Sequence, residues 1–338
     1  MSGDRPVRVL VADDSELFRQ LLARVVAADP GFEVVGTAED GRAAAALVGS
    51  LHPDVVTMDL EMPDADGFSG IARIMAETPT PILVLTARRA EAVAFRALSL
   101  GALDLLEKPA AGADLDAYAG ELLARLRLLA GVKVIRHPRG LRGRAAAPGP
   151  PERRADLVVI GASLGGPRAL ATLLRALPAG FRAPIAIVQH IADGFTAGLA
   201  GWLAQESRLE VREARDGDPL RPGLVLLAPS GRHLLVGQGV ARLSDAAPVE
   251  TFRPSVTPLF ASAARSYGAR ACGVLLTGMG RDGAEGLRLL RAAGAPTLAQ
   301  DEATSAVFGM ARAAIELGAV ERVLALEEIP RALQAMVR

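Results

Sequence analysis

The chain is poor in cysteine, with Cys272 as the single thiol in 338 residues, and this excludes an internal disulfide framework. Cys272 lies in the apolar run 271–276, which predicts a buried thiol rather than a reactive one. A structural metal site built on cysteine and histidine is also disfavoured. One thiol and four scattered histidines do not provide the ligand spacing that such a site requires.

An excess of charge of one sign is absent as well. Lys and Arg together number 38, as do Asp and Glu, so the net charge is zero and nothing in it predicts a nucleic-acid partner. Long apolar runs are missing: stretches such as 157–160 and 274–276 are far shorter than the roughly 20 residues of a membrane span. The first six residues lack the apolar segment of a signal peptide. We therefore expect a cytoplasmic protein without direct membrane insertion.

The first part of the chain, residues 1–130, alternates strand-like and helix-like patterns. Between the first two strand-like runs, apolar residues from Leu17 to Val26 form one helical stripe, and Ser15 is a candidate N-cap. Five βα units in series predict a parallel sheet with helices on both faces. The short apolar runs expected to be strands are 7–12, 33–37, 54–60, 82–86 and 103–106.

Residues 131–154 have no period and are rich in Pro, Gly and Arg, which predicts a flexible linker. A second α/β pattern fills 155–338 and indicates a doubly wound, mostly parallel α/β domain. Residues 233–243, with Gly237 and Gly239 between apolar runs, predict an inserted β-hairpin. Strands are expected at 157–160, 185–189, 224–227, 271–276 and 297–299, and helices at 168–177, 197–206, 258–267, 284–293 and 310–317.

Polar residues stand at the ends of the predicted strands in the first domain. Asp13 and Asp14 end the first strand, Asp59 ends the third, Thr86 ends the fourth, and Lys108 follows the fifth. The carboxyl ends of parallel strands meet at one edge of the sheet, where such folds bind ligands. Three carboxylates there repel one another unless a cation lies among them, and oxygen ligands suit Mg²⁺. A metal-held carboxylate can accept a phosphoryl group, while a hydroxyl and an ammonium hold its oxygens.

These residues resemble the signature of two-component receiver domains. The resemblance implies that Asp59 is the phospho-acceptor and that a sensor histidine kinase is the phosphodonor. It further implies that Asp13, Asp14, Asp59 and the carbonyl of Glu61 hold Mg²⁺, while Thr86 and Lys108 contact the phosphate. The motifs that carry the resemblance are Ala12-Asp13-Asp14-Ser15, 58–67, Leu85-Thr86-Ala87 and Lys108-Pro109.

A second constellation lies beyond the linker. Ser163 follows a predicted strand within Gly161-Ala162-Ser163-Leu164-Gly165-Gly166-Pro167, and small neighbours permit a sharp turn that exposes its hydroxyl. His190 and Asp282 follow two other strands, so a nucleophile, a base and an orienting carboxylate reach one sheet edge. A capping serine in a tight turn is the alternative for Ser163 alone. A dinucleotide-binding turn fits less well, because it needs glycine at that position. His233 is the rival base.

In the same order, these pieces resemble the catalytic domain of the chemotaxis protein-glutamate methylesterase family. The resemblance implies that Ser163 is the nucleophile, His190 the general base and Asp282 its orienting partner, with the Met279 backbone N–H as oxyanion donor. It implies hydrolysis of glutamate methyl esters on chemoreceptors, deamidation of receptor glutamines, and no cofactor for the esterase. The remaining motifs that carry it are 227–229, 253–256, 300–305 and 308–310.

Several positions depart from the two family patterns. An aromatic residue is usual where Leu105 stands, a small residue at Leu164, an acidic one at Thr257 and proline at Ala311. We expect a phosphorylation-activated hydrolase that supports sensory adaptation, with the unphosphorylated receiver inhibiting the catalytic domain. The alternatives are a phospho-regulated receptor-binding module without turnover, and a hydrolase of small esters.

Overall fold

The computed structural model describes residues 5–62, 67–87, 91–110, 112–132 and 154–337. The chain divides into two compact units, with the boundary between residues 139 and 140. That boundary, most of the predicted linker at 131–154, His137 and part of the 58–67 motif lie outside the described residues.

The first unit is built on a five-stranded parallel sheet in the order β2-β1-β3-β4-β5. Every residue of β3 and β4 is buried, which explains why these strands are continuous apolar runs rather than alternating ones. The strands are β1 (Val7–Ala12), β2 (Phe32–Ala38), β3 (Val55–Asp59), β4 (Ile82–Thr86) and β5 (Asp104–Glu107).

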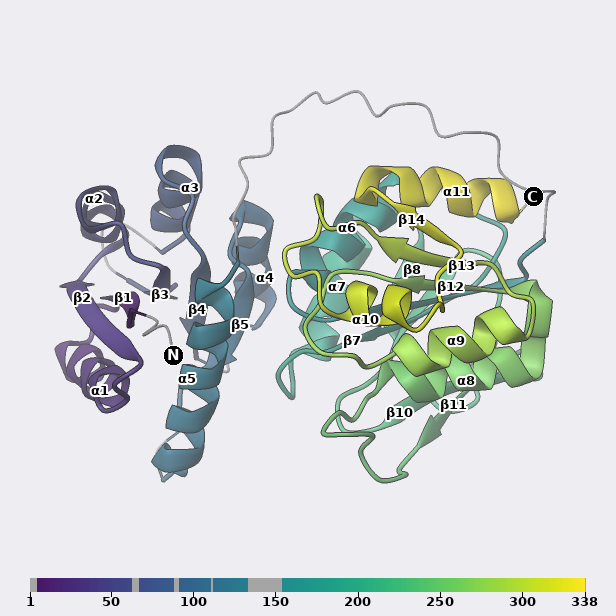
Figure 1. The fold of residues 1–338 in the computed structure, drawn as a ribbon, viewed down its shortest axis with the longest axis horizontal. Coiled ribbons are helices and arrows are strands. Elements are labelled where there is room, and N and C mark those ends of the chain that lie inside the picture. Colours follow the sequence, from purple (N-terminus) through teal and green to yellow (C-terminus); the bar gives the residue numbers. More distant parts are fainter. Residues whose placement is uncertain (1–4, 63–66, 88–90, 111, 133–153, 338) are drawn as a thin grey trace. The chain divides into compact units, whose positions relative to one another are not determined.

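Five helices alternate with these strands, and they cover both faces of the sheet (Figure 1). Helix α1 packs against α5, while α2, α3 and α4 pack side by side. Ser15 caps α1 by accepting a hydrogen bond from Phe18 N–H at 3.3 Å, so the predicted N-cap is confirmed. The helices are α1 (Glu16–Ala27), α2 (Gly41–Leu51), α3 (Gly67–Glu77), α4 (Glu91–Leu100) and α5 (Leu115–Ala130).

The second unit contains a seven-stranded parallel sheet in the order β14-β13-β12-β6-β7-β9-β8. Its central strands are wholly buried and form the core of the unit. The strands are β6 (Leu157–Ala162), β7 (Ile185–Gln189), β8 (Glu210–Glu213), β9 (Leu224–Leu227), β12 (Ala271–Leu275), β13 (Thr297–Gln300) and β14 (Arg322–Leu324).

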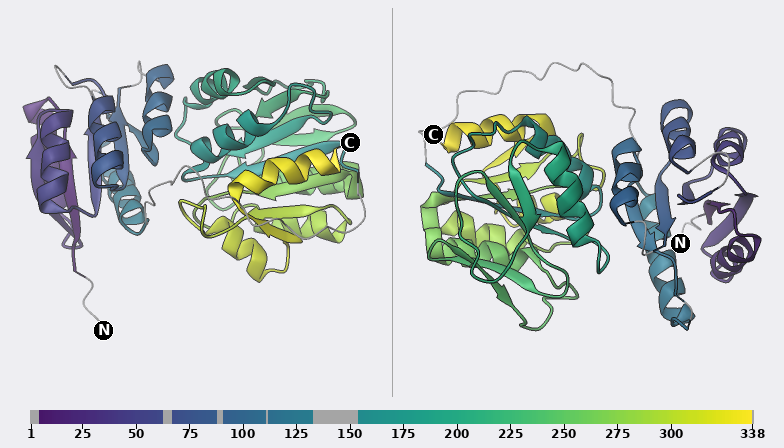
Figure 2. Two further views of the ribbon diagram at one scale, coloured as in Figure 1. Left: turned by 90° about the horizontal axis from the view of Figure 1, so that it is seen from above. Right: turned by 180° about the vertical axis from the view of Figure 1, so that it is seen from behind.

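Helices cover both faces of this sheet too. Helix α6 packs against α7 and α11 on one side, while α8 packs against α9, and α9 against α10, on the other (Figure 1). Figure 2 shows α11, in yellow, beside α6, in teal. The helices are α6 (Gly166–Ala176), α7 (Thr196–Glu206), α8 (Val256–Tyr267), α9 (Ala284–Ala292), α10 (Met310–Glu316) and α11 (Ile329–Met336).

The predicted hairpin is confirmed: β10 (His233–Gly237) pairs antiparallel with β11 (Val240–Ser244) outside the main sheet. Gln238 and Gly239 both have positive φ, at 53° and 78°, as the tight turn of such a hairpin requires. The pattern missed β8 and β14. Both are edge strands with charged residues, so neither has an apolar run.

Other predicted strands and helices agree with the structure to within a few residues, and the α/β class predicted for both units is confirmed. Pro167 occupies the first turn of α6, and Cys272 is a buried free thiol, as predicted, whose burial raises its pKa to about 12. Within the described residues, no helix combines the length and apolar character that crossing a membrane demands.

Candidate functional sites

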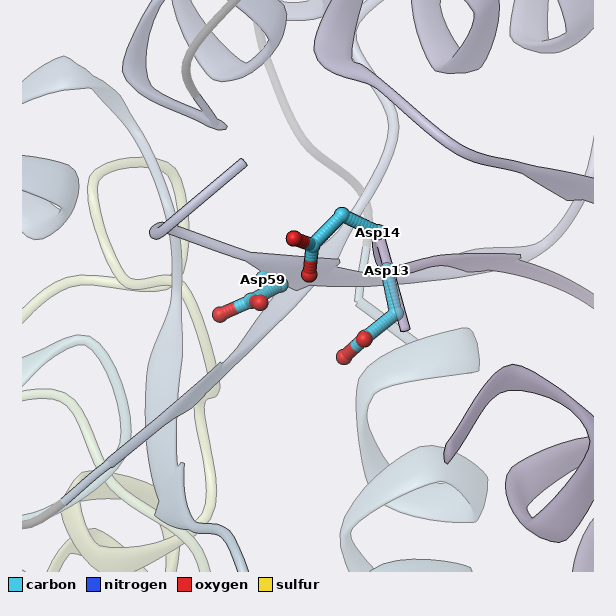
Figure 3. A group of neighbouring side chains, drawn as sticks. All are labelled: Asp13, Asp14 and Asp59. Carbon is cyan, nitrogen blue, oxygen red and sulfur yellow. The ribbon is translucent and has the colours of Figure 1, made fainter. Parts of the chain in front are cut away.

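Three carboxylates gather at the carboxyl edge of the first sheet (Figure 3). Asp13 directly follows β1 and Asp59 is the last residue of β3, and both are buried, whereas Asp14 is exposed. One oxygen from each of the three lies within 4.8 Å of the others. The sequence placed these residues at one edge from strand order alone, and the structure brings them together there.

Lys108, which follows β5, joins this cluster. Its Nζ lies 2.7 Å from Asp13 Oδ2 and 2.7 Å from Asp59 Oδ2, and it also sits over the Phe18 ring at 4.8 Å. Burial raises the pKa of Asp13 despite the nearby ammonium. Although burial lowers the pKa of Lys108, its bonds to the two carboxylates raise that pKa more. The cluster is therefore a buried arrangement in which one cation balances neighbouring acids.

The donor set suits Mg²⁺, which prefers oxygen ligands and keeps several waters. The exposed carboxylate of Asp14 leaves a solvent-facing side on which a phosphodonor can approach. Thr86, the last residue of β4, is buried, and its Oγ1 donates a long bond of 3.4 Å to Ala87 O. Leu105 is also buried, so this receiver-like fold has an aliphatic core residue where the family pattern has an aromatic one.

In the second unit, three adjacent strands carry the residues of the second constellation. β6 lies between β12 and β7, and the residues following these strands include Ser163, His190 and Asp282. The backbone joins the strand ends directly: His190 N–H donates to Ala162 O, and Ser163 N–H donates to Thr277 O, both at 3.0 Å. The nucleophile candidate thus stands between the ends that carry the base and carboxylate candidates.

Glycines make the turn at Ser163 possible. Gly165 has a φ of +74°, and a Cβ on Gly166 would lie 1.9 Å from Gln189 Oε1. Gly278 on the neighbouring loop packs against the nucleophile candidate, because a Cβ there would lie 2.7 Å from Ser163 Cβ. Ser163 Oγ has no hydrogen-bond partner among the described residues, so its hydroxyl is available to react.

His190 is held by two contacts. Its Nε2 lies 2.9 Å from Asp282 Oδ2, and its ring stacks on Phe252 at 4.0 Å with an interplanar angle of 1°. Donation from Nε2 to the carboxylate leaves Nδ1 as the proton acceptor. Nδ1 is buried and has no partner in the part of the chain that the structure describes. An imidazole in this state is ready to accept a proton.

Asp282 is anchored at the amino end of α8. Its Oδ2 accepts from Val256 N–H at 2.7 Å, and its Oδ1 accepts from Ser255 Oγ at 2.7 Å and Thr257 Oγ1 at 2.7 Å. Despite burial, the bonds from His190, Ser255 and Val256 lower its pKa to about 2. Asp282 is therefore ionised at neutral pH, and its negative charge lies beside the His190 ring.

Sequence reasoning missed Ser255, Thr257 and Phe252 as parts of this site. Thr257 also accepts a hydrogen bond from Gly283 N–H at 2.9 Å, so it holds both the Asp282 carboxylate and the backbone of the next residue. Thr257 had drawn attention only as a departure from the family pattern. The available signal in the sequence was weak: Ser255 and Thr257 are polar residues at the start of a predicted helix.

His233, the rival base, has a structural role. It is 1 % exposed, its Nε2 donates to Ala247 O at 3.1 Å, and its Nδ1 accepts from Ser255 N–H at 3.2 Å. Both ring nitrogens are occupied by backbone groups, so neither is available as a base. His52 is exposed at the end of α2 and lies in the first unit, away from this constellation in the chain.

The loop after β12 provides the candidate oxyanion donor. Gly278 N–H donates to Val307 O at 3.0 Å, whereas Met279 N–H has no acceptor among the described residues. The Met279 residue is 51 % exposed beside the Ser163 turn, which leaves its amide free for a ligand oxygen. The departures Leu164 and Ala311 are both buried, so they act through packing.

Comparison with known proteins matches both units. A family model described as CheB methylesterase matches residues 158–333, and one described as response regulator receiver domain matches residues 9–119. Protein-glutamate methylesterase/protein-glutamine glutaminase 2 of Anaeromyxobacter dehalogenans (strain 2CP-C) is 76% identical over 336 residues, covering 99% of this chain and 98% of that protein. The protein-glutamate methylesterase/protein-glutamine glutaminase 4 of Myxococcus xanthus (strain DK1622) is 45% identical, covering 98% of each.

The second unit also resembles a solved structure. The crystal structure of the Thermotoga maritima CheB methylesterase catalytic domain is 39% identical, with a TM-score of 0.53, and the match covers 54% of this chain and 99% of that one. This likeness covers the unit that carries Ser163, His190 and Asp282.

Proposed function

The chain belongs to the CheB methylesterase family, and we propose that Ser163, His190 and Asp282 form the triad that performs its reaction. Its activity is that of a protein-glutamate methylesterase and protein-glutamine glutaminase, regulated through a receiver domain. The observation that supports the triad most directly is the 2.9 Å contact between His190 Nε2 and Asp282 Oδ2. These two residues follow β7 and β12, the strands on either side of β6, and Ser163 follows β6. The alternative of a binding module without turnover is not supported, because the relatives are named as enzymes.

The first half of the reaction forms an acyl-enzyme. His190 Nδ1 takes the proton of Ser163 Oγ as this oxygen attacks the glutamyl ester carbonyl. Met279 N–H donates to the resulting oxyanion. The tetrahedral intermediate then collapses, the proton passes from His190 to the leaving group, and methanol departs from an ester or ammonia from a glutamine.

The second half releases the product. A water gives its proton to His190 Nδ1 and attacks the acyl-enzyme, and Ser163 Oγ leaves with that proton to give a free glutamate. Asp282 stays negative throughout, because its pKa is about 2, and it stabilises the imidazolium formed in each half. In this proposal the esterase steps use side chains and backbone of this chain together with one water, and no cofactor is assigned to them.

Phosphorylation of the receiver domain controls the esterase rate in this proposal. We assign Asp59 as the phospho-acceptor, Thr86 and Lys108 as the groups that contact the phosphoryl oxygens, and a sensor histidine kinase as the phosphodonor. Receiver domains use Mg²⁺ for phosphorylation, and Asp13, Asp14, Asp59 and the Glu61 carbonyl would hold it here. Phosphorylation replaces the Asp59 carboxylate with an acyl phosphate that carries about −1.5 to −2 charges, and it raises the esterase rate by releasing an inhibited state.

The remaining assignments complete this proposal. Residues 1–130 form the receiver, 131–154 a linker and 155–338 the catalytic domain, and the chain acts in the cytoplasm. The substrates are methyl-accepting chemoreceptors, whose glutamate methylation the enzyme reverses during sensory adaptation. Nucleic acid and membrane insertion have no part in this function.

Replacement of Ser163 by alanine tests the triad. We expect turnover to fall by about four to six orders of magnitude, as in other serine hydrolases. The assay is methanol release from methyl-labelled receptor membranes by the full chain. The matched control is Ser207→Ala, which removes a serine that caps α7 in the same unit. Substantial methanol release by the Ser163→Ala protein would reject the triad. Turnover of simple esters without receptor hydrolysis would instead indicate a small-ester hydrolase.

A further inference from the structure

Gln189, the last residue of β7, connects the nucleophile to the base. Its side chain is buried, with 5 % of the residue exposed. Nε2 donates one hydrogen bond to Ser163 O at 2.8 Å and another to His190 O at 2.7 Å. A single amide therefore uses both its protons to hold the backbone of the two residues that exchange the catalytic proton.

These two bonds complete the backbone network of the turn. Ser163 O also accepts from Gly166 N–H at 2.8 Å, so this carbonyl has two donors. His190 N–H already donates to Ala162 O at 3.0 Å, and the Gln189 amide adds the bond at the other side of the same residue. The β6 and β7 ends are thereby locked together at the point where Ser163 and His190 leave their strands.

Burial of the Gln189 amide costs free energy, because one of its two polar atoms has no hydrogen-bond partner among the described residues. Gln189 Oε1 is buried without a hydrogen-bond partner among the described residues, and it lies against Gly166, where any Cβ would collide with it. Rotating the amide would instead point Oε1 at two carbonyl oxygens. An apolar residue of similar size would avoid the unpaired oxygen, but it would lose both donors.

We propose that Gln189 is a positioning residue for the esterase, which fixes the backbone of Ser163 and His190 and thereby the positions of Ser163 Oγ and His190 Nδ1 relative to each other. The inference rests on the proposed function and deepens it. The Gln189 side chain is buried and bonds only to backbone oxygens, so we expect its loss to change the rate of the chemical step and to leave substrate binding intact. Because small displacements of reacting groups cost about 10²-fold in rate, the effect on kcat should be large for a buried residue outside the triad.

The main test is Gln189→Met in the full chain, which keeps the approximate volume and removes both donors. We expect kcat for methanol release to fall about 10- to 100-fold, with KM within about two-fold. The rate at which Ser163 Oγ displaces fluoride from a fluorophosphonate probe should fall by a similar factor. The pH dependence of kcat should keep its midpoint, because Asp282 still holds His190 Nε2.

Two further variants separate positioning from folding. Gln189→Glu keeps the reach of the side chain, but even a protonated carboxyl has one donor for the two carbonyls, so kcat should fall as in the Met variant. Thr297→Val is the matched control. Thr297 is buried at the amino end of β13, whereas Ser163 and His190 follow the carboxyl ends of their strands. Its Oγ1 accepts from Glu321 N–H at 3.0 Å. This variant should lower the unfolding temperature and keep kcat.

The outcomes are distinguishable from those of the triad test. Wild-type kcat and labelling rate in Gln189→Met, with an inactive Ser163→Ala protein, would overturn the positioning role alone. Equal losses of kcat in Gln189→Met and Thr297→Val would also overturn it, since the effect would then be one of general stability. An active Ser163→Ala protein would remove the proposed function and this inference together.

Discussion

Asp282 lies between His190 and the amino end of α8, and one carboxylate serves both. Its Oδ2 contacts His190 Nε2 at 2.9 Å and Val256 N–H at 2.7 Å. A carboxylate is favoured at a helix N-terminus, where free N–H groups carry partial positive charge. The position of the imidazole therefore depends on α8, an element that carries none of the three triad residues.

The acid sensitivity of the catalytic unit follows from this carboxylate. The pKa of Asp282 is about 2 in the folded chain, below its ordinary 3.8, so its bonds stabilise the fold above pH 4. That contribution, about 2 kcal/mol, is lost as the pH falls from 4 through 2. The Asp282→Asn protein should not show this pH-dependent loss in its free energy of unfolding. We would compare free energies of unfolding at pH 6 and pH 2 by the fluorescence of Trp202, the single tryptophan.

Asp156→Asn is the control for this comparison, because Asp156 is an exposed carboxyl in the same unit, paired with Arg270. Its free energy of unfolding should fall between pH 6 and pH 2 by the same amount as that of the wild type. If Asp282→Asn and the wild type lose the same free energy between the two pH values, Asp282 does not have the low pKa described above.

Thr257 is expected to matter through Asp282. Thr257→Val removes the bond to Asp282 Oδ1 and the acceptor of Gly283 N–H. We expect a loss of about 1–3 kcal/mol in the free energy of unfolding and roughly a ten-fold lower kcat. Thr257→Ser keeps the hydroxyl and should restore most of both. A Val variant with normal kcat would mean that Ser255 and the α8 amides alone suffice to hold Asp282.

Substitutions of His190 and His233 should have different effects on turnover and on stability. His190→Gln removes the base, so turnover should fall by about 10³-fold or more. His233→Gln leaves the base and disturbs two backbone contacts, and we expect lower stability with kcat within ten-fold of wild type. Parallel measurements of methanol release and thermal unfolding provide the comparison. Equal loss of turnover in both variants would contradict the assignment of His190 as the only base and make His233 a candidate again.

Much of the fold was predictable because parallel strands buried on both faces leave continuous apolar runs. The candidate residues Asp59, Ser163 and His190 were also found this way, since a polar residue that ends such a run lies at the carboxyl edge of the sheet. The edge strands β8 and β14 were missed, because strands exposed on one side contain charged residues and show no such run.

The supporting residues of the active site could not be found by the same reasoning. Phe252, Ser255 and Thr257 lie after the hairpin, and no strand order predicts that this segment folds back onto His190 and Asp282. Gln189 was visible in the sequence only as the neighbour of a histidine. Its two bonds to carbonyl oxygens depend on the register of β6 and β7, in which Ala162 pairs with Gln189.

The proposed function requires that phosphorylation of Asp59 controls the rate of the reaction at Ser163. One measurement tests this requirement directly. It is the initial rate of methanol release from methyl-labelled receptor membranes, with and without a small phosphodonor and Mg²⁺, for the wild type and Asp59→Asn. We predict that the donor raises the wild-type rate and leaves the variant at its unstimulated rate. Equal stimulation of both proteins, or no methanol release from either, would contradict the account.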